Sequence, residues 1–213
     1  MSKVIFIPTK NEYEYLFPNL SLKNHKIYFY TEYSGIKIIV TGIGKVNVTV
    51  SATHFFCTHD DVEEAYLVGI AGAYKECELD IGDVVSVEQD FFVDEGLIED
   101  NCLKMLNEIG FAVCEDNKTV FKTIDNLRHV NANTVSLLSS TDKLANLYKS
   151  KTDASIESME GAAFGLVCRK FNVTAYQIRS ISNYCGDRKK QKWNVKLAIR
   201  NLKHTLYSLL FVK

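Results

Sequence analysis

A small set of charged and amide side chains stands where the chain could carry out acid–base and hydrogen-bonding chemistry. Glu12 follows the first apolar segment and could take a proton from water, or it could be a solvated loop acid like its neighbour Glu14. Glu160 precedes a run of small residues, where a carboxylate can accept hydrogen bonds from adjacent hydroxyls or simply complement a helix dipole. Arg179 and Asn183 end a later apolar segment. A buried arginine needs a partner, and an amide both donates and accepts hydrogen bonds.

Two glycine-bearing segments and one charged run each allow a functional and a structural interpretation. Gly42–Lys45 could present backbone N–H groups to an anion, but it lacks the full spacing of a phosphate loop and the third glycine of a dinucleotide site. The small residues of Gly69–Ala73 permit close approach to a flat ligand, or only tight packing. Asp187–Lys192 could supply cations to a substrate carboxylate, or be a solvated loop.

Composition excludes several classes of protein. The 213 residues, 46% hydrophobic and 24% charged, predict one domain over residues 1–213 with a packed core. A net charge of −1 argues against nucleic acid or an anionic membrane as partner. The six cysteines form no C-x-x-C pair, so neither a disulfide scaffold nor a zinc site is expected. No apolar run reaches the roughly 20 residues of a membrane span, and the N-terminus does not resemble a signal peptide, which predicts a cytoplasmic protein.

The elements that must position these residues alternate along the chain. Short apolar runs predict strands at Val4–Ile7, Tyr28–Tyr33, Ile36–Thr41, Ala65–Ile70, Val84–Val93, Val130–Leu138 and Thr174–Ile181. Helices are expected at Lys45–Cys57, Asn101–Ile109, from a cap at Ser140 or Thr141 to Lys149, at Glu160–Phe171 and at Trp193–Leu210. This alternation predicts an α/β protein with a largely parallel sheet covered on both faces. Ligands of such sheets bind beyond the carboxyl ends of the strands, here the loops 8–14, 42–45, 69–74, 133–140 and 182–193.

Taken in order, these segments resemble the nucleoside phosphorylase and nucleosidase superfamily. The markers are Val4–Ile7 with Glu12, Thr41–Lys45, Gly69–Gly72, Ile81–Val85, Ser158–Ala163 and Arg179–Asn183. The branch that the chain resembles most is that of the futalosine hydrolases, through Gly69–Ala73, Glu157–Phe164, and Ser182–Arg188 followed by Trp193. The resemblance implies a three-layer αβα sandwich around a mixed, twisted sheet, hydrolysis of an N-glycosidic bond of a purine nucleoside, and a homodimer.

The resemblance also implies residue roles. Glu12 matches the general base that activates water, and Arg179 matches a residue that orients this water. Met159 and Glu160 match ribose contacts, and Asn183 matches the position that contacts the purine. The remaining substrate contacts are expected at Ala71, Gly72, Ser182, Val135 in a base-stacking loop, and Arg188 against the benzoate of futalosine.

One departure from the related nucleosidases for methylthioadenosine and adenosylhomocysteine bears on the substrate. Those enzymes carry Asp where this chain has Asn183, and Ser where it has Ile70. An amide cannot protonate N7, but it can donate to a 6-oxo group and accept from a protonated N7, which favours hypoxanthine over adenine. The expected reaction is the release of hypoxanthine and dehypoxanthine futalosine from futalosine by water, in menaquinone biosynthesis. No metal or organic cofactor is implied, because water, carboxylates and an amide suffice.

Three alternatives stay open at this point. The chain could act on adenine nucleosides such as methylthioadenosine, adenosylhomocysteine or aminofutalosine. It could be a purine nucleoside phosphorylase, although phosphorylases of the superfamily have a first loop with Gly and Arg, whereas this one reads Pro8–Asn11 with Lys10 as its one cation. It could also bind nucleosides without converting them, against which the presence of both Glu12 and Glu160 argues.

Overall fold

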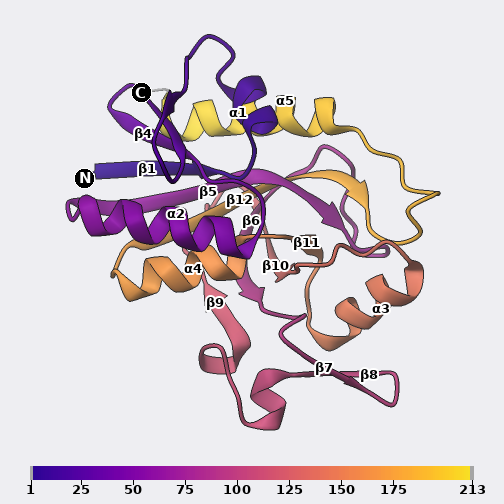
Figure 1. Cartoon of the computed structure of the whole chain (residues 1–213). Coiled ribbons are helices and arrows are strands. Elements are labelled where there is room, and N and C mark those ends of the chain that lie inside the picture. The colour runs from indigo at the N-terminus through magenta and orange to yellow at the C-terminus, as the bar shows by residue number, and fades with distance from the viewer. Residues whose placement is uncertain (1, 212–213) are drawn as a thin grey trace.

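The structure, a computed structural model that describes residues 2–211, has three layers. One face of the central sheet carries helices α1 (Lys10–Leu16) and α5 (Val195–Leu210), which pack on each other. The other face carries α2 (Lys45–Thr58) and α4 (Gly161–Lys170), which also pack together (Figure 1). This arrangement confirms the expected αβα sandwich. Within the described part of the chain, no helix combines the length and the apolar character needed to cross a bilayer.

The sheet is mixed and curls back on itself. Its strands follow the order β11-β10-β6-β12-β5-β1-β4-β3-β2, with β9 beside β6, and β11 also pairs with β5. Pairing is parallel for β4-β1-β5-β12 and for β6-β10-β11, and antiparallel between β6 and β12 and between β11 and β5. The strands are β1 (Ser2–Ile7), β2 (Lys23–Asn24), β3 (Phe29–Tyr33), β4 (Ile36–Val40), β5 (Val62–Ala73), β6 (Val84–Phe91), β9 (Lys118–Val120), β10 (Arg128–Thr134), β11 (Ile156–Ser158) and β12 (Thr174–Tyr184).

The apolar residues of strand β1 contribute to the core on both faces of the sheet. Successive side chains of a strand point to opposite faces. Val4 and Phe6 therefore join the core under α2 and α4, where Phe6 packs against Phe164 with ring centroids 5.2 Å apart. Ile5 and Ile7 join the core under α1 and α5. A strand buried on both faces ends at the sheet edge where ligands are expected.

The helix predicted at Asn101–Ile109 is wrong. The segment instead forms the second strand of a separate hairpin and a short 3₁₀ turn, which Gly110 ends in the left-handed conformation. Asp100 and Asn101 connect the two strands with φ values of +50° and +63°, and such positive φ values at both loop residues are typical of a two-residue hairpin turn. The elements are β7 (Gly96–Glu99), β8 (Cys102–Met105), η1 (Leu106–Ile109) and η2 (Glu115–Asn117), with helix α3 (Asp142–Lys151) beside them.

Two further differences lie next to the expected ligand edge. Residues 8–14 were expected as a loop, but α1 begins at Lys10 because the Thr9 hydroxyl caps the backbone N–H of Glu12 at 3.2 Å. Most of the loop expected at 69–74 is instead the end of β5, which continues to Ala73 because β12 and β11 pair with it on either side. Both changes bring Glu12 against the backbone of β5.

Candidate functional site

A cavity of about 420 Å³ opens where the carboxyl ends of β1, β5, β11 and β12 meet α1 and α5. This volume lies within the range usual for small-molecule sites. The residues that line it are Pro8, Thr9, Asn11, Glu12, Tyr15, Ile43, Ile70, Ala71, Gly72, Leu138, Glu157, Ser158, Met159, Glu160, Arg179, Ser182, Asn183, Trp193, Val195 and Ile199. The structure therefore brings together eight of the ten residues that the sequence placed in the site, all except Val135 and Arg188.

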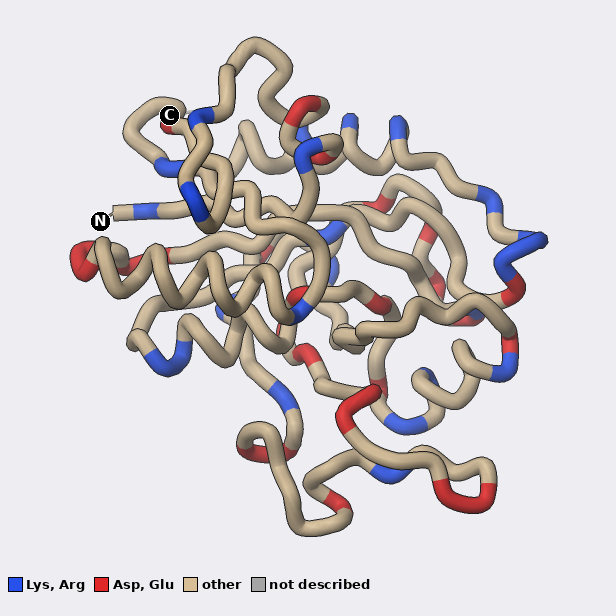
Figure 2. Tube along the Cα trace, viewed as in Figure 1, with Lys and Arg blue, Asp and Glu red and all other residues tan. Residues whose placement is uncertain are grey.

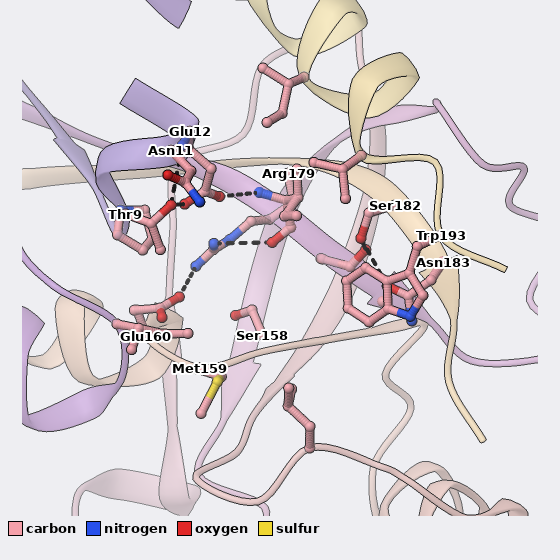
Figure 3. Close-up of a pocket in the computed structure, with 18 of the residues that line it drawn as sticks. Thr9, Asn11, Glu12, Ser158, Met159, Glu160, Arg179, Ser182, Asn183 and Trp193 are labelled. Atoms are coloured by element: carbon pink, nitrogen blue, oxygen red, sulfur yellow. Dashed lines mark hydrogen bonds and ion pairs between the residues drawn. The ribbon is translucent and has the colours of Figure 1, made fainter. Parts of the chain in front are cut away.

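Glu12 is buried at one end of the cavity, on the first turn of α1. Its Oε1 accepts a hydrogen bond from the Ile70 N–H at 2.9 Å, and its Oε2 accepts one from the Thr9 hydroxyl (Figure 3). Burial raises the pKa of Glu12, while the hydrogen bonds from Thr9 and Ile70 oppose that shift. A carboxylate with a raised pKa is a stronger base than an exposed glutamate, which suits the removal of a proton from water.

Arg179 and Glu160 form an ion pair beside Glu12. Both side chains are almost fully buried, and Nη2 of Arg179 lies 3.2 Å from Oε2 of Glu160. Figure 3 shows the guanidinium between the two glutamates. A Cβ at Gly69 would lie 2.8 Å from both Arg179 Nη1 and Glu12 Oε1, so the sheet has room for this pair of groups only because residue 69 is glycine.

The Gly42–Lys45 loop positions the Glu160 carboxylate and does not form an anion site. The backbone N–H of Gly44, with a φ of +93° that favours glycine, donates to Oε1 of Glu160 at 2.9 Å. Lys45 points elsewhere, with its Nζ 2.6 Å from a carboxylate oxygen of Asp94 and of Glu95. Both oxygens of Glu160 are therefore fixed by groups from distant parts of the chain.

Asn183 lies at the other end of the cavity, as Figure 3 shows. The hydroxyl of Ser182 lies 2.8 Å from Oδ1 of Asn183 and 3.2 Å from the carbonyl oxygen of Ala71. Nδ2 of Asn183 donates to the carbonyl of Tyr184 at 3.3 Å. These contacts turn the amide so that an Nδ2 hydrogen remains for a ligand.

Some polar atoms in the cavity have no protein partner. Within residues 2–211, the buried Nε of Arg179 and Oγ of Ser158 lack a hydrogen-bond partner, and both residues line the cavity. Buried polar groups are normally paired, so these two atoms are available to water or to a substrate hydroxyl. Met159 lies between Ser158 and Glu160 and presents an apolar edge to the same space (Figure 3).

Two of the residues predicted in the site do not line the main cavity. The side chain of Val135 is fully buried in a core cluster with Tyr148. Leu138, three residues later, lines the cavity instead. Arg188 lies in an adjoining hollow, with its guanidinium 4.8 Å from the ring centroid of Trp193. Figure 2 shows its neighbourhood, the loop before α5, as a cluster of basic residues.

Several residues that shape the site have no role predicted from the sequence. Thr9 holds Glu12, and a threonine three residues before a glutamate is a recognisable cap signal. Trp193, expected as the first residue of the last helix and as a marker of the resemblance, forms a wall of the cavity. Glu157 also lines it, and no local pattern in the sequence marks this carboxylate as part of a site.

The cavity is acidic, and its chemistry fits a reaction in which positive charge develops. Its lining residues in the described range include three glutamates and one cation, Arg179, which is already paired. Two carboxylates at one end and an amide at the other can bind a polar molecule with hydroxyls at one end and a hydrogen-bonding ring at the other. Residues 2–211 contain no group of three or more His, Cys, Asp or Glu side chains arranged to hold a metal ion.

Comparisons with known proteins agree with this geometry. The chain is 31% identical over 191 residues to the futalosine hydrolase of Thermus thermophilus, a match that covers 83% of this chain and 82% of that protein. The solved structure of the futalosine hydrolase of Helicobacter pylori is 18% identical, with a TM-score of 0.78 over 98% of this chain and 97% of that one. The 5′-methylthioadenosine/S-adenosylhomocysteine nucleosidase of the same organism, with butyl-thio-DADMe-Immucillin-A, is 18% identical, with a TM-score of 0.78 over 99% and 98%. At these identities the two structures show a shared fold.

A family model also matches most of the chain. The model of the phosphorylase superfamily matches residues 10–210, which include every residue of the candidate site except Pro8 and Thr9. The match spans most of the chain and agrees with the 31% identity to the futalosine hydrolase of Thermus thermophilus. This chain therefore belongs to the phosphorylase superfamily.

Proposed function

We propose that the protein hydrolyses the N-glycosidic bond of a purine nucleoside, with futalosine as substrate and hypoxanthine as the released base. The observation that carries this proposal is the arrangement of one cavity, with Glu12, Arg179 and Glu160 at one end and Asn183 at the other. The 31% identity to the futalosine hydrolase of Thermus thermophilus supports the choice of substrate.

The carboxylate of Glu12 is the general base of the proposed reaction. Glu12 takes a proton from a water molecule whose oxygen forms a bond to the anomeric carbon of the ribose. The bond from that carbon to N9 of the purine breaks, and the base leaves with the bonding electron pair and takes up a proton. The ribose passes through an oxocarbenium-like state, whose positive charge the nearby Glu160 carboxylate stabilises. Glu160 also accepts hydrogen bonds from ribose hydroxyls beside Met159, and Arg179 orients the water.

Several contacts favour water over phosphate as the nucleophile. Phosphate needs cations and free N–H donors. Arg179 is already paired with Glu160, and the Gly44 N–H is taken by the same carboxylate. Nζ of Lys10 lies 3.5 Å from the ring centroid of Phe29, and Lys10 is not among the described residues that line the cavity. A phosphate would therefore meet mainly carboxylates.

The cavity also offers places for the rest of futalosine. Tyr15 and Ile43 are exposed apolar side chains close in sequence to Glu12 and Gly44, which gives the ribose end an apolar surface for an aromatic substituent. Arg188 is the proposed partner of the benzoate carboxylate. It would reach that group if the substituent lies across Trp193, on which the guanidinium stacks.

The setting of the reaction belongs to the same proposal. A free nucleoside as substrate fits an enzyme of the cytoplasm that acts in menaquinone biosynthesis. A homodimer is expected from the resemblance to the superfamily. Size-exclusion chromatography with light scattering measures the oligomeric state directly, and a mass of one chain of 24.1 kDa would contradict the dimer.

Product analysis with four nucleosides tests the proposed function. Futalosine, aminofutalosine, methylthioadenosine and inosine are each incubated with the purified protein, with and without phosphate, and the bases are identified by chromatography. We expect hypoxanthine from futalosine at a rate that phosphate does not change. Release of base only with phosphate would show a phosphorylase, faster release of adenine would show an adenine nucleosidase, and tight binding without turnover would show a binding protein.

A further inference from the structure

A second carboxylate faces Asn183 across a glycine. In the sheet, Gly72 of β5 pairs with Glu157 of β11 on one side and with Asn183 of β12 on the other. Directly paired residues of neighbouring strands project to the same face of a sheet, and two strand spacings amount to about 10 Å. Glu157 and Asn183 therefore project side by side, separated by a residue without a side chain. Both line the cavity and the hollow that adjoins it.

Glu157 is held in one orientation by donors behind it. Its Oε1 accepts from the Ser139 N–H at 2.9 Å, and its Oε2 accepts from the Ser139 hydroxyl at 2.6 Å and from the Tyr74 hydroxyl at 3.3 Å. Burial raises the pKa of Glu157, and the hydrogen bonds from Ser139 oppose that shift. The thiol of Cys185 also hydrogen-bonds to this carboxylate. A thiol is a weak donor, so the carboxylate keeps the capacity to accept from a stronger N–H donor of a ligand.

The glycine between the two side chains keeps the space open. A Cβ at Gly72 would lie 2.8 Å from Sγ of Cys185 and 3.3 Å from Nδ2 of Asn183. A side chain at this position would crowd the amide of Asn183 and the thiol of Cys185. A flat ring edge is the shape of ligand that fits between the amide and the carboxylate.

The two flanking groups match one purine edge and oppose another. A 6-oxopurine such as hypoxanthine presents an N–H donor at N1 beside the acceptors O6 and N7. Adenine presents an acceptor at N1, which a carboxylate repels. The Ser139 N–H beside Glu157 donates to its Oε1 and is therefore not free for an acceptor such as the N1 of adenine. Building on the proposed nucleosidase function, we propose that Glu157 is a specificity-determining residue that accepts the N1–H of a 6-oxopurine while the remaining Nδ2 hydrogen of Asn183 is donated to O6.

A substitution of Glu157 by Gln tests this assignment with matched substrates. Futalosine and aminofutalosine differ in the 6-oxo and 6-amino groups of the base. A site built to bind one pattern rejects the other by orders of magnitude, so we expect the wild type to favour futalosine in kcat/KM by at least about 100-fold. In the Glu157→Gln variant an NH₂ group replaces one carboxylate oxygen and the negative charge is lost, so the side chain no longer repels the N1 acceptor of a 6-aminopurine. The variant should therefore lose at least about tenfold of this preference. The exposed Glu76 supplies the control Glu76→Gln, which should leave the preference unchanged.

Binding of free bases to the wild-type protein separates this inference from the proposed function and needs no variant. By calorimetry, hypoxanthine should bind at least about tenfold more tightly than 1-methylhypoxanthine, which lacks the N1–H. Equal affinities, or an unchanged preference in Glu157→Gln, would overturn the role of Glu157 even if futalosine is hydrolysed. Selective hypoxanthine binding without hydrolysis of any nucleoside would instead overturn the proposed function and leave the role of Glu157 in place.

Discussion

Replacement of Glu12 by glutamine changes the base of the proposed reaction while keeping its shape. The amide oxygen can still accept from the Ile70 N–H, and the new NH₂ group can donate to the Thr9 hydroxyl, which has free lone pairs. Burial raises the pKa of Glu12, so the ionised side chain is unfavourable in the folded protein as pH rises. The neutral amide removes that cost, so Glu12→Gln should unfold at a urea concentration no lower than the wild type does at pH 8.

In Glu12→Gln, the loss of catalytic rate should be much larger, in free energy, than the change in the free energy of unfolding. Removal of a general base typically reduces the rate by about 10² to 10⁴, equivalent to roughly 3–5 kcal/mol of activation free energy. The side chain does not hold the substrate in this mechanism, so the loss should appear in kcat with KM nearly unchanged. Glu14 lies two residues away on the same helix and is exposed, so Glu14→Gln is the matched control and should retain full activity.

The assay is the initial rate of hypoxanthine release from futalosine between pH 4 and 9. Because the base must be ionised, kcat/KM of the wild type should fall on the acid side with a midpoint above the ordinary glutamate pKa of 4.5. Glu12→Gln should remove that acid limb together with the activity. Unaltered hydrolysis in Glu12→Gln would refute the assignment. Loss of the acid limb in Glu160→Gln, with a limb that persists in Glu12→Gln, would move the role of the base to Glu160.

Three other perturbations follow from the geometry. Gly69→Ala places a Cβ 2.8 Å from both Arg179 and Glu12, so kcat should fall at least about tenfold, and activity equal to the wild type would contradict the packing. Burial raises the pKa of Asp90 from 3.8 to about 6, so the folded protein keeps a proton that the unfolded chain loses between these values. The free energy of unfolding should therefore decrease by up to about 3 kcal/mol as pH rises through this window, and urea unfolding of Asp90→Asn should lack that decrease. Arg188→Ala should raise KM for futalosine but hardly for inosine, and equal effects in steady-state assays would reject pairing with the benzoate.

The sequence predicts the elements whose signals are local. Lys45–Cys57 and Trp193–Leu210 each match a helix of the structure to within two residues at either end, and Ser34-Gly35 forms the predicted hairpin turn. Strands such as β2, β9 and β11, with two or three residues each, carry no pattern of their own. They exist because a distant strand pairs with them, and propensity within a short window does not contain that information.

In the site, too, residue identities could be predicted from the sequence, whereas contacts between distant residues could not. The residue types of Glu12, Arg179, Glu160 and Asn183, with the family resemblance, were enough to place them in one cavity. The contacts that hold these side chains in place involve residues far away in the sequence. The Gly44 N–H, for example, donates to Glu160 from 116 residues away. Val135 lies in the loop that follows β10, but its side chain packs in the core, and Leu138 of the same loop lines the cavity instead.

Closure of the sheet by β11 connects the two ends of the proposed site. Strand β11 pairs with β5 through Ile156 and Glu157, and helix α4 begins at Gly161, directly after Glu160. Residues 156–160 therefore include both Glu157, proposed to bind N1–H of the base, and Glu160, proposed to stabilise the charge on the ribose. A shift of β11 by one residue would turn Glu157 away from Asn183, because side chains of a strand alternate between its faces. Choice of base and cleavage of the bond thus depend on one short strand, whose register is fixed by β5 and β10 together.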